Sequence, residues 1–134
     1  MESLSWASSS DEADRPLLVL VVDDDAAMRD YVRGCLAPLT THVLEASDGV
    51  QALELARSAV SEHLRVVIAD IRMPRMDGIA LREAMMSDPS LAPVRLLLIT
   101  GDASLGEIPG VPILRKPFNA RVLQASVKAL LETG

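Results

Sequence analysis

Apolar and polar positions alternate along the chain in blocks that predict strands and helices in turn. The first block, Leu17 to Val22, reads LLVLVV, a short continuous run of apolar and β-branched residues. Such a run is typical of a strand that is covered on both faces in a parallel sheet. Apolar residues then recur at helical spacing from Met28 to Leu39, which predicts an amphipathic helix that Pro38 helps to end.

The same alternation of strand and helix continues to the end of the chain. Further strands are predicted at 42–46, 66–69, 95–100 and 112–114, and helices around Leu53 to Val60, Leu81 to Met85 and Leu123 to Leu131. Asp25 is expected to cap the first helix, and Asp77 and Asn119 stand at N-cap positions of the last two helices. The segment GDASLGEIPGVP, with three Gly and two Pro, favours a loop with at most one or two helical turns around 103–107.

This order of elements predicts an α/β fold with five strands and about five helices. Strands that alternate with helices imply right-handed crossovers and a doubly wound parallel sheet with helices on both faces. The fourth helix is expected to be short or absent. A chain of 134 residues with 49% hydrophobic residues suits one domain, expected at 16–134. Residues 1–15, rich in Ser and acidic residues, are expected to form a flexible leader.

Charge and cysteine content exclude several classes of function. The formal net charge of −6 argues against direct binding of nucleic acid or anionic lipid. No apolar run reaches the roughly 18 residues that span a bilayer, and the start of the chain does not resemble a signal peptide, so we expect a cytoplasmic protein. The single cysteine, Cys35, lies on an apolar helical face and is interpreted as a small buried residue.

Four predicted strands end in polar residues that a buried apolar run would not otherwise contain. These residues are Asp23 with Asp24, then Asp70, Thr100 and Lys116. The carboxyl ends of strands in an open α/β sheet meet at the edge where ligands bind, so we expect these side chains to converge. Three clustered carboxylates repel one another unless a cation lies among them, and a set of oxygen donors favours Mg²⁺.

A carboxylate next to such a cation can accept a phosphoryl group and form an aspartyl phosphate. Asp70 is the expected acceptor because it ends the central strand, whereas Asp23 and Asp24 are better placed to hold the metal. Mg²⁺, the Lys116 ammonium and the Thr100 hydroxyl would then each neutralise one oxygen of the transferring group.

The segments VVDDD (21–25), IADIRMPRMDG (68–78), ITG (99–101) and RKPF (115–118) together resemble the response regulator receiver family. The resemblance covers about 17–131 and implies a flavodoxin-like strand order, 2-1-3-4-5. It also implies that Asp23 and Asp24 are the acidic pair, Asp70 the phosphoacceptor, Thr100 the switch hydroxyl and Lys116 the family's lysine. The backbone carbonyl of Arg72 would complete the metal shell, and the Lys116–Pro117 peptide bond would be cis.

The chain departs from the family pattern between Thr100 and Lys116. This segment is shorter than usual, and Ile113 stands where the family has a switch aromatic residue. The usual coupling of a Thr100 movement to an inward-turning aromatic ring therefore needs a substitute. A short segment of this kind is similar to the receivers of hybrid histidine kinases, which often relay phosphoryl groups.

The leading hypothesis is a phosphoacceptor module of a two-component phosphorelay. It would take a phosphoryl group from a histidine kinase or a histidine phosphotransfer protein and promote only its own phosphorylation and dephosphorylation. Two alternatives remain: a receiver-like interaction domain that is not phosphorylated, and a Mg²⁺-dependent aspartyl-phosphate phosphohydrolase. Such hydrolases generally carry an acid two residues after the nucleophile, where this chain has Arg72. The Arg72 side chain could reach the entrance of the site, where water or a partner approaches, although an arginine at such a position is more often a surface cation. The cognate kinase, the output partner, the oligomeric state (monomer or weak dimer) and any larger parent protein stay open.

Overall fold

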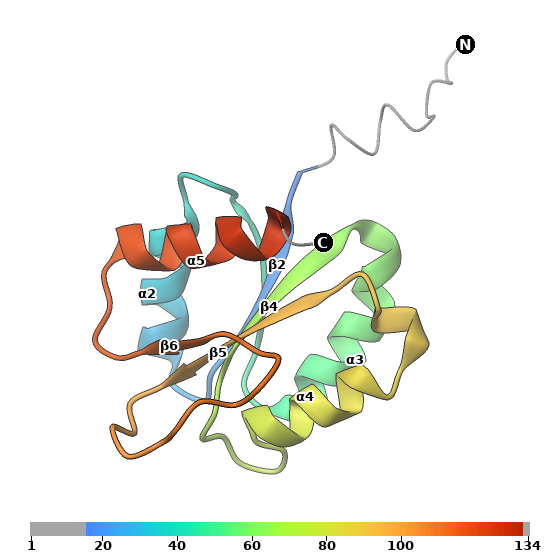
Figure 1. Cartoon of the computed structure of the whole chain (residues 1–134). Coiled ribbons are helices and arrows are strands. Elements are labelled where there is room, and N and C mark those ends of the chain that lie inside the picture. The colour runs from blue at the N-terminus through green and yellow to red at the C-terminus, as the bar shows by residue number, and fades with distance from the viewer. Residues whose placement is uncertain (1–15, 133–134) are drawn as a thin grey trace.

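Five parallel strands form the centre of the computed structural model, which describes residues 16–132 (Figure 1). The strands are β2 (Leu18–Val22), β3 (His42–Ala46), β4 (Leu64–Asp70), β5 (Arg95–Thr100) and β6 (Ile113–Arg115). The α-helices are α2 (Ala26–Leu36), α3 (Gly49–Ala59), α4 (Gly78–Met86) and α5 (Ala120–Glu132), with short 3₁₀ helices η1 (Val60–Glu62) and η2 (Pro89–Leu91). The leader expected at 1–15 lies outside the described residues.

The order of the strands is β3-β2-β4-β5-β6, and every neighbouring pair is parallel. Counted along the chain, this is the expected order 2-1-3-4-5. The register aligns the carboxyl ends, because Val22 pairs with Ala69, Asp70 with Ile99, and Thr100 with Arg115. The residues that follow β2, β4, β5 and β6 therefore reach the same edge of the sheet.

Two helices cover each face of the sheet, α2 and α5 on one side and α3 and α4 on the other (Figure 1). Successive side chains of a strand point to opposite faces, and both faces here are apolar. In β4, Val66 and Ile68 join the core under α2 and α5, whereas Val67 and Ala69 join the core under α3 and α4. Burial on both faces explains why the strands read as continuous apolar runs.

Side-chain caps begin the helices where the sequence predicts them. Asp25 accepts a hydrogen bond from the backbone N–H of Ala27 at the start of α2, and Asp77 accepts one from Ala80 at the start of α4. Asn119 accepts one from Val122 at 2.9 Å. Cys35 is buried in the core under α2 and α5, as its apolar surroundings predicted.

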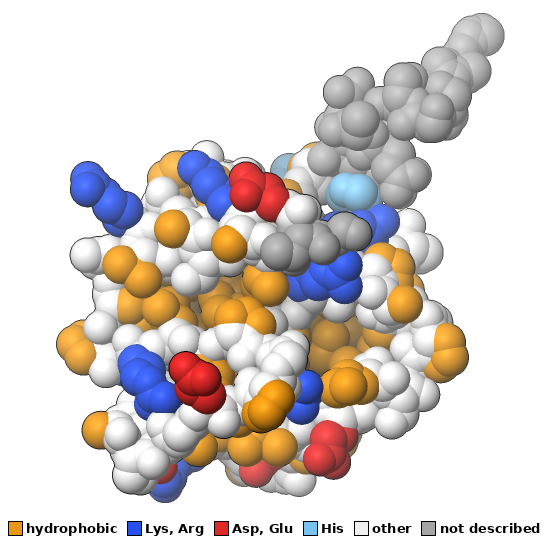
Figure 2. Space-filling view, in the orientation of Figure 1, with side chains coloured by type: hydrophobic (Ala, Val, Ile, Leu, Met, Phe, Trp, Pro, Cys, Tyr) orange, Lys and Arg blue, Asp and Glu red, His pale blue; other side chains and the backbone are white. Residues whose placement is uncertain are grey.

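No helix connects β5 to β6 in the described residues, so the fourth helix, predicted to be short or absent, is absent there, and the described residues form four α-helices where about five helices were expected. Residues 101–112 run as turns and extended chain, and Leu105, Ile108 and Val111 pack against the core on the α3 and α4 side. A largely apolar cavity of about 910 Å³ lies nearby, between α4, η2, the start of β5 and α5. Figure 2 shows hydrophobic side chains gathered in hollows on this face.

None of the helices within residues 16–132 combines the length and apolar composition that crossing a bilayer requires.

Candidate functional site

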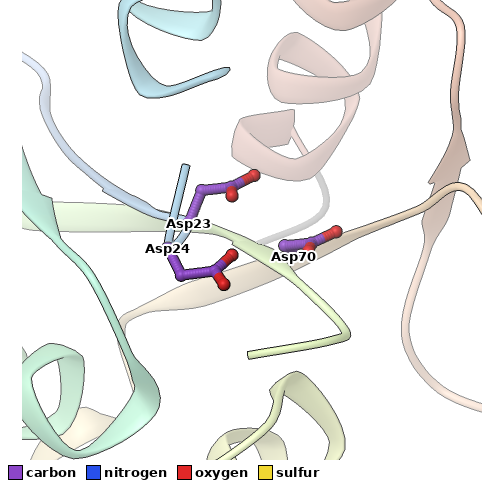
Figure 3. Close-up of side chains that lie close together, drawn as sticks. All are labelled: Asp23, Asp24 and Asp70. Carbon is purple, nitrogen blue, oxygen red and sulfur yellow. The ribbon is translucent and has the colours of Figure 1, made fainter. Parts of the chain in front are cut away.

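Three carboxylates lie side by side at the carboxyl edge of the sheet (Figure 3). Asp23 and Asp24 directly follow β2, and Asp70 is the last residue of β4; each offers a carboxylate oxygen within 4.8 Å of the others. Asp23 keeps 4% and Asp70 8% of its surface exposed, while Asp24 is exposed. The parallel pairing of β2 with β4 thus brings the predicted acidic residues into one cluster, in which two of the three residues are buried.

Burial makes the ionised forms of two of these carboxylates costly. Desolvation is the main cause that raises the pKa of Asp23 to about 6, and the neighbouring negative charge of Asp70 adds to it, although a hydrogen bond from the Asp25 backbone N–H opposes the rise. Desolvation also raises the pKa of Asp70, against the opposing charge of Lys116. A cation placed among the carboxylates would offset both effects.

Lys116 directly follows β6, two strands away from β4, and reaches Asp70 along the carboxyl edge of the sheet. Its ammonium nitrogen lies 3.3 Å from Asp70 Oδ1. The Lys116 backbone N–H donates to the carbonyl of Thr100 at 2.8 Å, which fastens the end of β6 to the end of β5. The Lys116–Pro117 peptide bond is cis, as the resemblance implied.

Thr100 is 2% exposed at the end of β5, and its hydroxyl oxygen accepts a hydrogen bond from the Asp102 backbone N–H at 3.0 Å. Asp70, Thr100 and Lys116 line a common cavity of about 470 Å³. The cavity is large enough for a phosphoryl group, and it presents a carboxylate, a hydroxyl and an ammonium to it.

The connection from β4 to α4 holds Asp70 in place. The Ile71 backbone N–H donates to the Ile99 carbonyl at 2.9 Å, and the Gly78 N–H donates to the Ile71 carbonyl at 2.8 Å. A Cβ atom at Gly78 would lie 2.8 Å from the Asp70 carbonyl oxygen, closer than side chains tolerate. Only glycine lets α4 begin against the end of β4 at this distance.

Sequence reasoning missed Asp102. The Arg72 Nη2 atom donates to Asp102 Oδ2 at 2.8 Å, so the cation that follows β4 pairs with the acid that follows β5. Hydrogen bonds from Ser104 and then from Arg72 lower the pKa of Asp102 to about 2. The sequence carried only a weak signal for this pair: Arg72 stands two residues after Asp70, and Asp102 stands two residues after Thr100 on the neighbouring strand.

The donor set fits a hard divalent cation. Asp23, Asp24 and Asp70 offer oxygen atoms only, and these are the ligands that Mg²⁺ prefers. The two buried carboxylates also have the raised pKa values that a bound cation would correct. The Arg72 carbonyl stays a prediction as a further ligand.

Comparison with known proteins decides the family. The family model of the response regulator receiver domain matches residues 19–128. The chain belongs to this family. The receiver is 33% identical over 121 residues to the chemotaxis protein CheY of Pseudomonas aeruginosa, an alignment that covers 85% of the receiver and 95% of that protein. The receiver is also 33% identical over 118 residues to the probable transcriptional regulator ycf27 of Guillardia theta. That alignment covers 84% of the receiver but only 44% of the relative.

A solved structure supports the same assignment. The chemotaxis response regulator CheY4 of Vibrio cholerae superimposes on the receiver with a TM-score of 0.74 at 30% identity, covering 86% of the receiver and 98% of that chain. The receiver therefore has the CheY fold and belongs to two-component signalling, whose receiver domains are phosphorylated by histidine kinases. An acidic pocket of the kind that binds Mg²⁺ in this family is present in this chain.

Proposed function

We propose that this receiver accepts a phosphoryl group from a phosphohistidine onto Asp70, in the presence of Mg²⁺, and then loses it to water. One observation carries the proposal. Asp70 lies within 4.8 Å of the two other carboxylates and 3.3 Å from the Lys116 ammonium, beside a cavity that also contains the Thr100 hydroxyl. This combination supplies a nucleophile, a metal-binding set and two groups that neutralise phosphoryl oxygens.

In the proposed reaction an Asp70 carboxylate oxygen forms a bond to phosphorus as the P–N bond of the phosphohistidine breaks. The electron pair of that bond leaves with the imidazole nitrogen of the donor. Lys116 would hold one phosphoryl oxygen through its ammonium, and the Thr100 hydroxyl would donate to another. Water later attacks phosphorus, the bond to Asp70 breaks, and inorganic phosphate leaves with the carboxylate regenerated. The chain would thus act only on its own phosphoryl group.

Asp23 and Asp24 would hold Mg²⁺ together with Asp70 and the Arg72 carbonyl. When bound, the metal supplies positive charge to the phosphoryl oxygens and to the crowded carboxylates. Asp23, which is buried and accepts a hydrogen bond from the Asp25 backbone, has a fixed orientation, whereas the exposed Asp24 is open to solvent.

The phosphodonor would be a histidine kinase or a histidine phosphotransfer protein. A phosphohydrolase that acts on small molecules is disfavoured, because Arg72, which stands where such enzymes need an acid, is bound to Asp102. A receiver-like interaction domain that is never phosphorylated is the second candidate, and the missing helix between β5 and β6 favours it. The two candidates are distinguished by whether Asp70 becomes phosphorylated.

Intact mass spectrometry after incubation with phosphoramidate tests the proposal. We expect wild-type protein with Mg²⁺ to gain one phosphoryl group, and Asp70→Asn to gain none. Wild-type protein with a chelator should react at least about a hundredfold more slowly. A wild-type chain that stays unmodified would favour the interaction domain, and equal uptake by Asp70→Asn would remove Asp70 from its role.

A further inference from the structure

Asp102 connects two residues of the site to the turn that follows β5. Its carboxylate accepts a hydrogen bond from Arg72 Nη2 at 2.8 Å, and its backbone N–H donates to Thr100 Oγ1 at 3.0 Å. The other carboxylate oxygen accepts from the backbone N–H and the hydroxyl of Ser104 at 2.9 and 2.6 Å. Asp102 thus holds site residues on one side and the turn on the other.

The same turn is fastened to β6. The Asp102 carbonyl accepts hydrogen bonds from the Leu105 backbone N–H and from Arg115 Nη1, both at 3.2 Å. Arg115 Nη2 donates to the Leu105 carbonyl at 2.6 Å, and the Leu105 side chain packs against the core on the α3 and α4 side. A change at Asp102 therefore reaches β6 and the apolar core through a single turn of chain.

The ion pair between Arg72 and Asp102 is easily broken. The Arg72 side chain is 78% exposed and that of Asp102 26%, and an exposed ion pair contributes little stability because water solvates both charges. Arg72, Asp102 and Asp70 line the same cavity. A phosphoryl group on Asp70 would bring up to about two negative charges into this cavity and compete with Asp102 for the guanidinium.

We propose that Arg72 and Asp102 form a latch that phosphorylation of Asp70 opens, an inference that rests on the proposed function. In the unphosphorylated receiver, Arg72 pairs with Asp102, and the Thr100 hydroxyl accepts from the Asp102 N–H. A phosphoryl group draws the guanidinium and the hydroxyl to its own oxygens, so Asp102 loses its hydrogen bonds to Arg72 and Thr100. The turn at 102–105 is then released, which provides a readout in the segment that lacks a helix.

Hydrogen exchange of backbone amides in the full chain tests the latch, with Mg²⁺ and beryllofluoride as the phosphoryl analogue. Binding of the analogue is measured first, as a rise in Tm that Asp70→Asn abolishes. We expect the amides of Asp102 and Leu105 to exchange at least about fivefold faster in the bound form, because their hydrogen bonds open more often. The Val111 amide, which donates to the Ile108 carbonyl, should keep its rate.

Arg72→Ala opens half of the latch without any analogue. We expect this variant to raise the exchange rate of the Asp102 amide about two- to threefold, the effect of losing one exposed ion pair, and to respond less to beryllofluoride. Arg57→Ala is the matched control, since it removes a 2.8 Å ion pair with Asp88, and neither of these residues lines the cavity. The control should leave the Asp102 amide unchanged.

Exchange rates at Asp102 and Leu105 that are equal in free and analogue-bound wild type would overturn the latch and leave phosphoryl acceptance standing. The same holds if Arg72→Ala and Arg57→Ala behave alike. A Tm of wild type that does not respond to beryllofluoride would instead remove the proposed function, and the latch with it.

Discussion

Among single residues, Asp23 shows how a buried carboxylate lowers the free energy of unfolding when no metal is bound. It is almost fully buried, and desolvation together with the charge of Asp70 raises its pKa to about 6 from an ordinary value of 3.8. The folded protein therefore holds the Asp23 proton more tightly than the unfolded chain does. Its contribution to stability is present below pH 3.8 and is lost as the pH rises through about 6.

Asp23→Asn should accordingly stabilise the metal-free protein at neutral pH. We expect the free energy of unfolding to rise by about 1–3 kcal/mol at neutral pH and the difference from wild type to vanish near the ordinary pKa. Urea unfolding in the presence of a chelator, repeated from acid to neutral pH, measures this. Asp30→Asn, at an exposed position of α2, is the control and should change the free energy of unfolding at neutral pH by no more than about 0.5 kcal/mol. A metal-free wild type that is more stable than Asp23→Asn at neutral pH would contradict the account.

At the scale of elements, the placement of the site follows from where the strands stop. The apolar runs and the polar residues that end them are visible in the sequence, so the convergence of Asp23, Asp24, Asp70 and Lys116 could be predicted once a parallel sheet was assumed. The caps at Asp25 and Asp77 could be predicted because capping depends on local chain only.

Contacts between neighbouring loops could not be predicted in the same way. The Arg72–Asp102 ion pair joins two loops that are 30 residues apart, and its formation depends on how the segment after β5 turns. That segment has weak local preferences, since its Gly and Pro residues exclude a long helix without selecting one alternative. The sequence therefore predicted that the helix between β5 and β6 is short or absent, and the structure shows that no helix forms there in the described residues.

Gly78 links the start of α4 to the acceptor strand, and its replacement tests that link. In Gly78→Ala the added Cβ would lie 2.8 Å from the Asp70 carbonyl oxygen and 2.9 Å from the Ile71 Cα, so the end of β4 must shift. We expect a loss of about 1–3 kcal/mol in the free energy of unfolding, together with slower phosphorylation of Asp70.

Gly34→Ala is the matched control for this substitution. Gly34 lies within α2, and a Cβ there meets no atom within 4 Å, so the variant should be as stable as wild type or gain up to about 1 kcal/mol. Urea unfolding measures both variants. A Gly78→Ala protein as stable as Gly34→Ala would show that the close approach of α4 to β4 does not constrain the site.

In the whole molecule, the faces of the sheet provide stability, and its carboxyl edge carries the residues of the site. The two apolar cores, one on each face, provide the burial that stabilises the fold, while the carboxyl edge concentrates charge that the fold alone does not neutralise. Such a site gains stability when a cation binds the folded state only. We therefore expect Mg²⁺ to bind and stabilise the folded receiver before any phosphoryl group arrives.

Thermal unfolding during a Mg²⁺ titration at neutral pH measures whether the metal binds the folded receiver. We expect wild-type Tm to rise with Mg²⁺ concentration, with a gain near 2.7 kcal/mol when the free ion is about a hundredfold above its Kd. We expect this response to be largely lost in Asp23→Asn and in Asp24→Asn. A wild-type Tm that does not depend on Mg²⁺, or a rise of equal size in all three proteins, would contradict this expectation.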